Sequence, residues 1–157
     1  MASSLHYLTV QDVLWINLKA TRKVHHFSYA KLEEATYYQY AYGESNTLAR
    51  QAARFVTGFL KMQPFDEGND ATAFIGLLAF LRLNGRCIDL NDEDALAWFG
   101  EVEHDRAYAK DAIDAISHPS ADHHHDAKPD VRQCILSVLT DYPKSVEELV
   151  GREMAIG

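Results

Sequence analysis

The segment from about Asp70 to Leu83 is apolar on most faces when its residues are placed on a helix. Its apolar run, near Ala71–Leu81, is interrupted by Arg82 and is too short to span a bilayer. Asn84 and Gly85 then supply a helix stop. A helix that is apolar nearly all round has to be covered on every side, so this segment predicts a central buried helix.

Helical periodicity dominates the rest of the chain, and the only short extended piece is expected at 86–90. We therefore predict an all-α fold with about seven or eight helices around the central one. The other helices are expected from Thr9, over 28–42, 46–62, 92–103, 105–116, 130–142 and 145–154.

Several helix ends carry capping residues. Thr9 is expected to start the first helix, with Asp12 in its first turn, and Ser145 with Glu148 has the spacing of a capping box. Ser28 and Asn46 are expected to cap the second and third helices. The second helix is expected to run through Tyr42 and to end at Gly43.

Composition indicates one compact domain. The chain has 157 residues, of which 47% are hydrophobic and 24% charged. A formal charge of −8 argues against a nucleic-acid surface, which needs a basic patch. Cys87 and Cys134 lack metal-binding spacing and are expected to be free thiols in a reducing compartment. No signal peptide or membrane span is evident, so we expect a cytoplasmic protein without a membrane partner.

The chain divides into a helical core over 1–116, a His-rich loop over 117–130, and C-terminal helices over 131–157 that pack on the same domain. The loop contains three successive histidines between two aspartates. Such a tract can bind Zn²⁺ or Ni²⁺, but adjacent histidines in a loop seldom form a rigid site, so a solvated loop is the alternative. The candidate ligands are His123, His124 and His125.

The junction before the central helix has residues with distinct local roles. Pro64 disfavours helix at Gln63, so the preceding helix should end near Met62. Phe65 is expected to anchor the loop in the core. Gly68 permits a tight turn, and Asn69 is expected to cap the central helix. Free N–H groups at a helix start can bind an anion, although an ordinary helix–loop–helix junction is the simpler interpretation.

The same stretch, Q-P-F-D-E-G-N-D-A-T-A over 63–73, resembles the H-P-F-x-D/E-G-N-K/G-R motif of the Fic/Doc family, which T-A often follows. The match includes Pro64, Phe65, Glu67, Gly68, Asn69, Thr72 and Ala73. Gln63 stands at the position of the family histidine, Asp70 at that of the lysine or glycine, and Ala71 at that of the arginine. Further resemblance lies in Y-L-T-V-Q-D-V over 7–13 and L-L-A-F-L-R-L-N-G over 77–85, so it spans about residues 5–100.

The resemblance implies a helical fold and a nucleotide site. It places a diphosphate at Gly68, Asn69 and Asp70, and Mg²⁺ at Glu67, with ATP as the nucleotide. The family histidine acts as a general base, for which Gln63 has no titratable proton. Ala71 supplies no charge, and the negative Asp70 would repel a triphosphate. We therefore expect a protein without AMP- or phosphotransferase activity and with at most a weak, vestigial pocket.

In the family, a flap before the motif helix holds the target peptide, and residues 25–45 occupy that place here. The tyrosines over 37–42 are explained either by packing or by contact with a partner. His25 or His26 is the alternative proton acceptor. Glu101 and His104 have the spacing of a di-iron ligand pair but lack a second pair, so an exposed helix face is expected.

Three functions follow as hypotheses. The first is a non-catalytic binding module that keeps part of the phosphate pocket. The second is an active nucleotidyl- or phosphotransferase with an unusual base, either a protein AMP-transferase or a kinase-like toxin. The third is a protein-interaction scaffold in a toxin–antitoxin or prophage system. We expect a protein partner, either a target protein or an antitoxin, while the sequence leaves the oligomeric state open.

Overall fold

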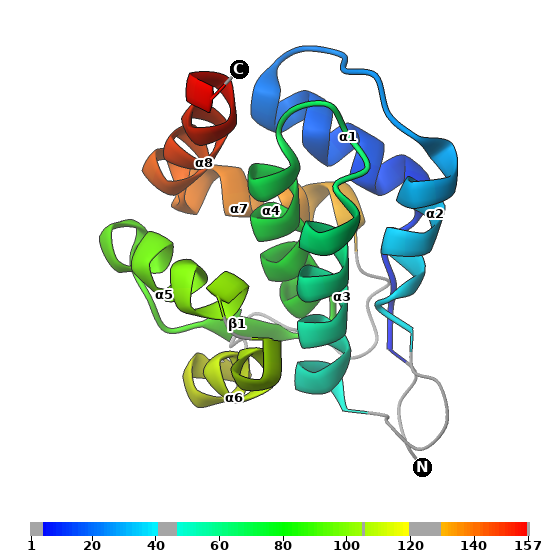
Figure 1. Ribbon diagram of the computed structural model, residues 1–157. Helices are drawn as coiled ribbons and strands as arrows, with labels where there is room; N and C mark the ends of the chain where they lie inside the picture. Colours follow the sequence, from blue (N-terminus) through cyan, green and yellow to red (C-terminus); the bar gives the residue numbers. More distant parts are fainter. Residues whose placement is uncertain (1–4, 41–46, 105, 120–129, 157) are drawn as a thin grey trace.

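The structure, a computed structural model, describes residues 5–40, 47–104, 106–119 and 130–156. The described residues form an all-α fold of eight helices and one short two-stranded ribbon (Figure 1). The elements are α1 Val10–Thr21, α2 Tyr29–Tyr37, α3 Leu48–Met62, α4 Asn69–Leu83, β1 Arg86–Ile88, α5 Asp92–His104, α6 Arg106–Ile116, β2 Ser117–Pro119, α7 Val131–Asp141 and α8 Pro143–Ile156.

Helix α4 is the central helix that its composition predicts. It contacts α1, α3, α7, α8 and β1, and Figure 1 shows it in the middle of the molecule. Every α4 residue except Asp70 and Arg82 is buried. Because burial of apolar surface is the main force that favours folding, the covering of α4 on all sides determines how the other helices are arranged.

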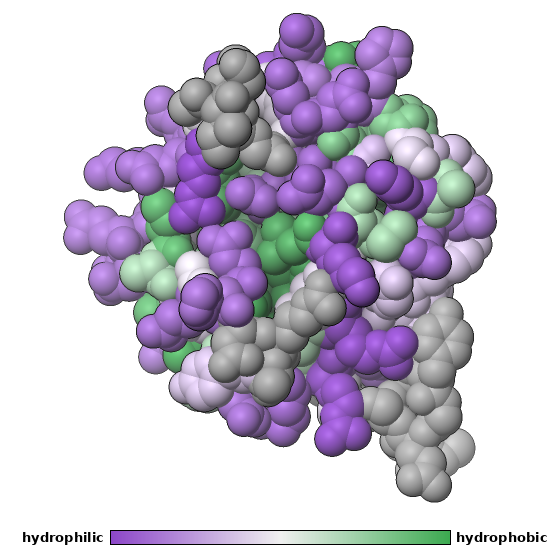
Figure 2. All heavy atoms as spheres, viewed as in Figure 1, coloured by the Kyte–Doolittle hydropathy of each residue, from purple (hydrophilic) through white to green (hydrophobic). Residues whose placement is uncertain are grey.

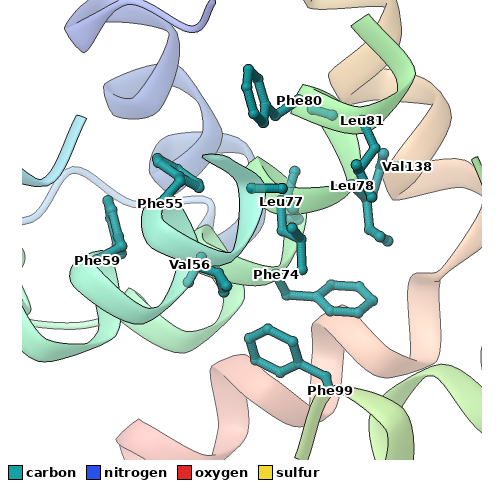
Figure 3. Packing of buried hydrophobic residues seen from close by; sticks show 14 of the residues in the cluster. Phe55, Val56, Phe59, Phe74, Leu77, Leu78, Phe80, Leu81, Phe99 and Val138 are labelled. Carbon is teal, nitrogen blue, oxygen red and sulfur yellow. The ribbon is translucent and has the colours of Figure 1, made fainter. Parts of the chain in front are cut away.

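Aromatic rings join α4 to its neighbours (Figure 3). The Phe74 ring meets Phe99 of α5 edge-on at 5.2 Å between centroids, and Tyr142 beside α8 at 5.8 Å. On the other side, Phe80 lies 6.5 Å from Phe55 of α3. These edge-to-face and tilted contacts are favourable arrangements of aromatic pairs.

The first two helix starts are confirmed. The Thr9 hydroxyl accepts a hydrogen bond from Asp12 N, and the Asp12 carboxylate accepts one from Thr9 N, which completes a capping box. The Ser28 side chain caps α2. Helix α2 ends at Tyr37 and continues as a turn, earlier than the predicted end at Tyr42. The predicted stop at Gly43 and cap at Asn46 lie outside the described residues.

Residues 117–119 correct the predicted loop over 117–130. They form β2, which pairs antiparallel with β1 so that Cys87 faces His118 and Ile88 faces Ser117. The partner strand lies far away in sequence, so local composition alone did not predict this pairing. The predicted metal ligands His123, His124 and His125 lie outside the described residues.

The predicted capping box of the last helix is wrong. Helix α8 begins at Pro143, and Ser145 lies inside its first turn. The Ser145 hydroxyl and the N–H groups of Lys144 and Ser145 donate to Asp92 at the start of α5, over 2.8–3.0 Å. A side chain from another helix therefore binds the free N–H groups of α8.

The surface in the view of Figure 2 is mainly hydrophilic, with hydrophobic residues visible in smaller areas between the polar ones. This agrees with the burial of the large apolar side chains against α4. Among the described residues, none of the helices combines the length and the apolar character that a membrane crossing requires.

Candidate functional site

The loop between α3 and α4 begins as the sequence predicts. Helix α3 ends at Met62, and Gln63 follows in the left-handed conformation with φ 44° and ψ 65°. The Gln63 side chain is exposed, and its N–H donates to Phe59 O at 3.0 Å. Phe65 is 5% exposed and lies against Phe59, which confirms that it anchors the loop in the core.

Asn69 does not cap α4, contrary to the prediction. The N-cap residue is Gly68, and Asn69 is the first helical residue. Its side chain turns back into the loop, where Oδ1 accepts from Phe65 N at 3.0 Å and Nδ2 donates to Phe65 O at 2.7 Å. The amide thus satisfies both backbone groups of a buried residue, a role that needs a donor and an acceptor together.

Gly68 lies against α1, which the sequence analysis did not connect with this loop. Its φ is +84°, and an added Cβ would lie 2.5 Å from Thr21 Cγ2 and 2.9 Å from Asn17 Nδ2. The buried Asn17 Nδ2 donates to Glu67 O and to Thr72 Oγ1, at 3.0 and 3.1 Å. One signal was available in the sequence, because Asn17 lies among the apolar residues of an amphipathic helix.

A second segment pairs with the loop. Ser28 N donates to Pro64 O at 2.9 Å, and Asp66 N donates to His26 O at 3.0 Å, so residues 26–28 run antiparallel to 64–66. Between these two bonds, Phe27 lies opposite Phe65, and their rings are 5.9 Å apart. The residues that the resemblance assigns to the flap therefore include a strand-like segment beside the loop over 63–68, which we call the motif loop.

The structure brings His25 to Glu67. His25 Nδ1 lies 3.7 Å from Glu67 Oε2, and the two side chains are 8% and 44% exposed. This distance exceeds that of a good hydrogen bond. The cavity between them, which Thr21, Lys23 and Val150 also line, measures about 50 Å³. Pockets for drug-sized ligands typically measure about 300–1,000 Å³, so a nucleotide does not fit this space.

Asp70 is held beside an arginine from the other end of the chain. Arg152 of α8 lies 3.8 Å from Asp70 Oδ2 and 3.0 Å from Glu103 Oε1 of α5. Partial burial, followed by the nearby Glu103 carboxylate, raises the pKa of Asp70 above 3.8, and Arg152 offsets only part of this rise. The local arrangement therefore disfavours further negative charge at the start of α4.

These contacts limit what the start of α4 can bind. Gly68 and Asn69 are buried, the Asn69 amide is used within the loop, and two carboxylates surround Arg152. Within the described ranges, no three or more His, Cys, Asp or Glu side chains come together as a metal site. In this conformation the residues do not fit ATP with Mg²⁺, and a weak vestigial pocket stays a prediction.

Other candidate residues lie apart from this loop. Glu101 and His104 are both exposed on α5, which confirms the expected helix face. The Tyr40 ring packs against Tyr7 in a tilted arrangement, with 4.3 Å between the centroids, and the Tyr38 ring lies against Gly58. Packing thus explains these two tyrosines. Tyr37, which is 46% exposed, is available for contact, and none of the three lines the cavity at Glu67.

A larger groove of about 350 Å³ lies between α1, the segment 23–28 and α7. The exposed fractions of Leu18, Val24 and Phe27 there are 39%, 79% and 40%. The remaining lining residues include Leu14, Trp15, Lys23, Phe65 and Arg132. The Arg132 guanidinium lies 4.6 Å above the Trp15 ring, so a cation forms one wall of an apolar groove.

Comparison of the chain with models of protein families, with curated proteins and with solved structures found no match. The resemblance to the Fic/Doc family consequently stays a prediction that rests on the residues of the loop and its flanking helices.

Proposed function

We propose that this protein is a degenerate Fic/Doc-like module that lacks transferase activity and binds a protein partner. The partner contributes an extended, acidic segment with apolar side chains, which lies along residues 24–28 in the groove of about 350 Å³. In this proposal the segment belongs to a target protein or to an antitoxin of a toxin–antitoxin system. The groove lies directly beside the motif loop.

One observation carries the binding proposal, namely the backbone of Phe27. His26 O and Ser28 N bind the motif loop, whereas Phe27 N–H and C=O make no hydrogen bond with any part of the chain that the structure describes. In an antiparallel pair, these two groups point to the opposite edge. An unpaired edge beside exposed apolar side chains is the arrangement that binds an added peptide strand.

Charge favours an acidic segment. Lys23 and Arg132 line the groove, and Lys19 lies one turn from it with its ammonium 5.2 Å from the Trp15 ring. Opposite charges accelerate association and exclude partners of the wrong sign. These cations gather at one groove of a chain whose net charge is −8.

Peptide selection tests this binding. Extended peptides selected from a random library on the full chain should be enriched in acidic and apolar residues, and calorimetry then gives their affinity. Leu18→Asp and Val24→Asp should each weaken binding at least about tenfold, since they place negative charge in the groove. Leu136→Asp is the matched control, because Leu136 is 38% exposed and lies outside the groove. Equal weakening by the control, or no selectable peptide, contradicts the binding proposal.

The proposed inactivity rests on Gln63 and on the surroundings of Asp70. Loss of a general base costs about 10²–10⁴-fold in rate. Incubation with ATP labelled in the α- or γ-phosphate, Mg²⁺ and cell extract should transfer no label. Gln63→His alone should not restore transfer, because Ala71 and Asp70 leave the phosphates without cations. Calorimetric titration of the protein with ATP–Mg²⁺ should show no binding. A binding signal that disappears in Glu67→Ala would instead indicate a retained pocket.

A second function is favoured by one contact, between His25 and Glu67 at 3.7 Å. An imidazole next to a carboxylate is a common pair for proton transfer, and this distance supports His25 as the candidate base at this loop. If the unmodified protein transfers label and His25→Ala abolishes the transfer, the enzyme hypothesis replaces the inactive one. His26→Ala is the control, since His26 is exposed and its backbone carbonyl contacts the loop.

A further inference from the structure

A third pocket lies at the opposite end of α3 from the motif loop. It measures about 330 Å³ and lies between the start of α3, β1 and the end of α6 (Figure 1). Three cationic residues from three different elements line it, namely Arg50, Arg86 and Lys110. Asp114 is the one acidic residue among the described residues of its lining, so the pocket has a net positive charge in a chain of net charge −8.

Arg86 is held in place by Ser117, and the part of the chain that the structure describes leaves other N–H donors of its guanidinium without a partner. Its Nη2 donates to Ser117 O at 2.8 Å and to Ser117 Oγ at 3.0 Å, across the β1–β2 ribbon. A guanidinium has five N–H donors in a planar fork. Fixing one nitrogen of the fork lowers the entropic cost of binding an anion with the others.

The side chains of Arg50 and Lys110 make few or only long contacts with the described residues. Arg50 is exposed, and its guanidinium makes no hydrogen bond or ion pair with the described part of the chain. Lys110 Nζ lies 3.8 Å from Asp114 Oδ2 and 3.9 Å from Asp111 Oδ1, both long for ion pairs and both exposed. Such surface pairs contribute little stability, so an anion with two or more charges can displace them.

The start of α3 adds hydrogen-bond donors to the same pocket. Thr47 is its N-cap residue, but the Thr47 side chain makes no capping hydrogen bond. Leu48, Ala49 and Arg50 form the first turn and line the pocket. The N–H groups of a first turn have no partner within the helix and favour negative charge.

We propose that this pocket binds a small polyanion of the phosphate class, such as a diphosphate group. Arg50, Arg86 and Lys110 neutralise its charge, and the first turn of α3 donates hydrogen bonds to its oxygens. The 15 residues of α3 place this pocket about 22 Å from the motif loop, at 1.5 Å per residue. The proposal is therefore independent of any nucleotide site at Glu67.

Titration of the full chain with inorganic pyrophosphate, without divalent cations and at low ionic strength, tests the pocket. Lys110→Glu and Arg50→Glu should each weaken binding about tenfold, because each replaces an attraction with a repulsion. Asp114→Asn should strengthen binding, since it removes the negative charge of the described lining. Lys61→Glu is the matched control, at the exposed far end of the same helix.

Amide chemical shifts locate the bound anion. The largest changes should fall on residues 48–50 and on β1, and Glu67→Ala should leave the affinity unchanged. Circular dichroism of each variant confirms that it folds. Absence of binding at about 10 mM pyrophosphate would overturn the proposal. So would equal weakening by Lys61→Glu and Lys110→Glu, which would indicate a general effect of net charge.

Discussion

At the scale of single residues, two buried amides shape the motif loop. Asn69 satisfies the backbone of Phe65, and Asn17 joins Glu67 O to Thr72 Oγ1. Both amides are buried and form hydrogen bonds there, and a buried polar group without a partner would be destabilising. The loop therefore owes its shape to polar side chains as well as to Pro64 and Gly68.

Asn69→Ala should lower the free energy of unfolding by about 2–4 kcal/mol, because it leaves two buried backbone groups of Phe65 without partners. Urea denaturation measures the change. Gln63→Ala, in the same loop but exposed, should change stability by less than about 0.5 kcal/mol. Similar losses from both variants would show that the Asn69 contacts do not stabilise the loop.

Gly68→Ala should destabilise the protein by about 2–4 kcal/mol, since φ is +84° and the new Cβ would meet Thr21 and Asn17.

Gly100→Ala in α5 is the opposite case. An added Cβ at Gly100 would meet nothing within 4 Å, so alanine should stabilise the helix by about 0.5–1 kcal/mol. Thermal unfolding of the two variants distinguishes these results, and a tolerated Gly68→Ala would refute the close approach of α1.

At the scale of elements, neighbouring helices satisfy each other's ends. Asp92 begins α5 and at the same time accepts hydrogen bonds from Lys144 N and Ser145 N at the start of α8. Burial would raise the pKa of Asp92, but the hydrogen bonds from Lys144 and Ser145 outweigh it and lower the pKa below 3.8. The folded state thus favours the charged carboxylate.

Asp92→Ala should cost about 1–2 kcal/mol at neutral pH, as for the loss of an N-cap. Because the folded pKa is below the ordinary 3.8, this stabilisation is fully present above pH 3.8 and is lost as the pH falls through the folded pKa. The difference between variant and parent in urea denaturation should therefore shrink in acid. Asp94→Ala, in the same first turn but without a hydrogen bond or ion pair to the described side chains and backbone of α8, should cost less at neutral pH.

At the scale of the whole molecule, the helix that follows the motif loop is also the centre of the core. Helices from both halves of the sequence cover α4, and α8 brings Arg152 to its first turn. The motif loop is therefore continuous with α4, the helix at the centre of the core. We expect the described helices to unfold as one cooperative unit.

Phe74→Ala should cost about 3–5 kcal/mol, because it empties the contact between α4, α5 and Tyr142. The fluorescence of Trp15 and Trp98, from α1 and α5, should lose intensity at the same urea concentration as the helical circular dichroism. Tyr29→Ala, at a side chain that is 59% exposed, is the control with little effect. Separate transitions for different probes would contradict a single cooperative unit.

The sequence by itself determined the features that depend on neighbours along the chain. The apolar faces of 70–83, the start of α1 at Thr9 and the end of α3 before Pro64 follow from local periodicity and backbone sterics. Tertiary structure decided the contacts between distant residues, such as Asp92 with α8, His25 with Glu67, Arg152 with Asp70, and β1 with β2. Judged from its sequence neighbours alone, the Asn69 side chain could either cap the start of α4 or bind the backbone of the preceding loop. Only the space and the partners available in the folded core select between the two.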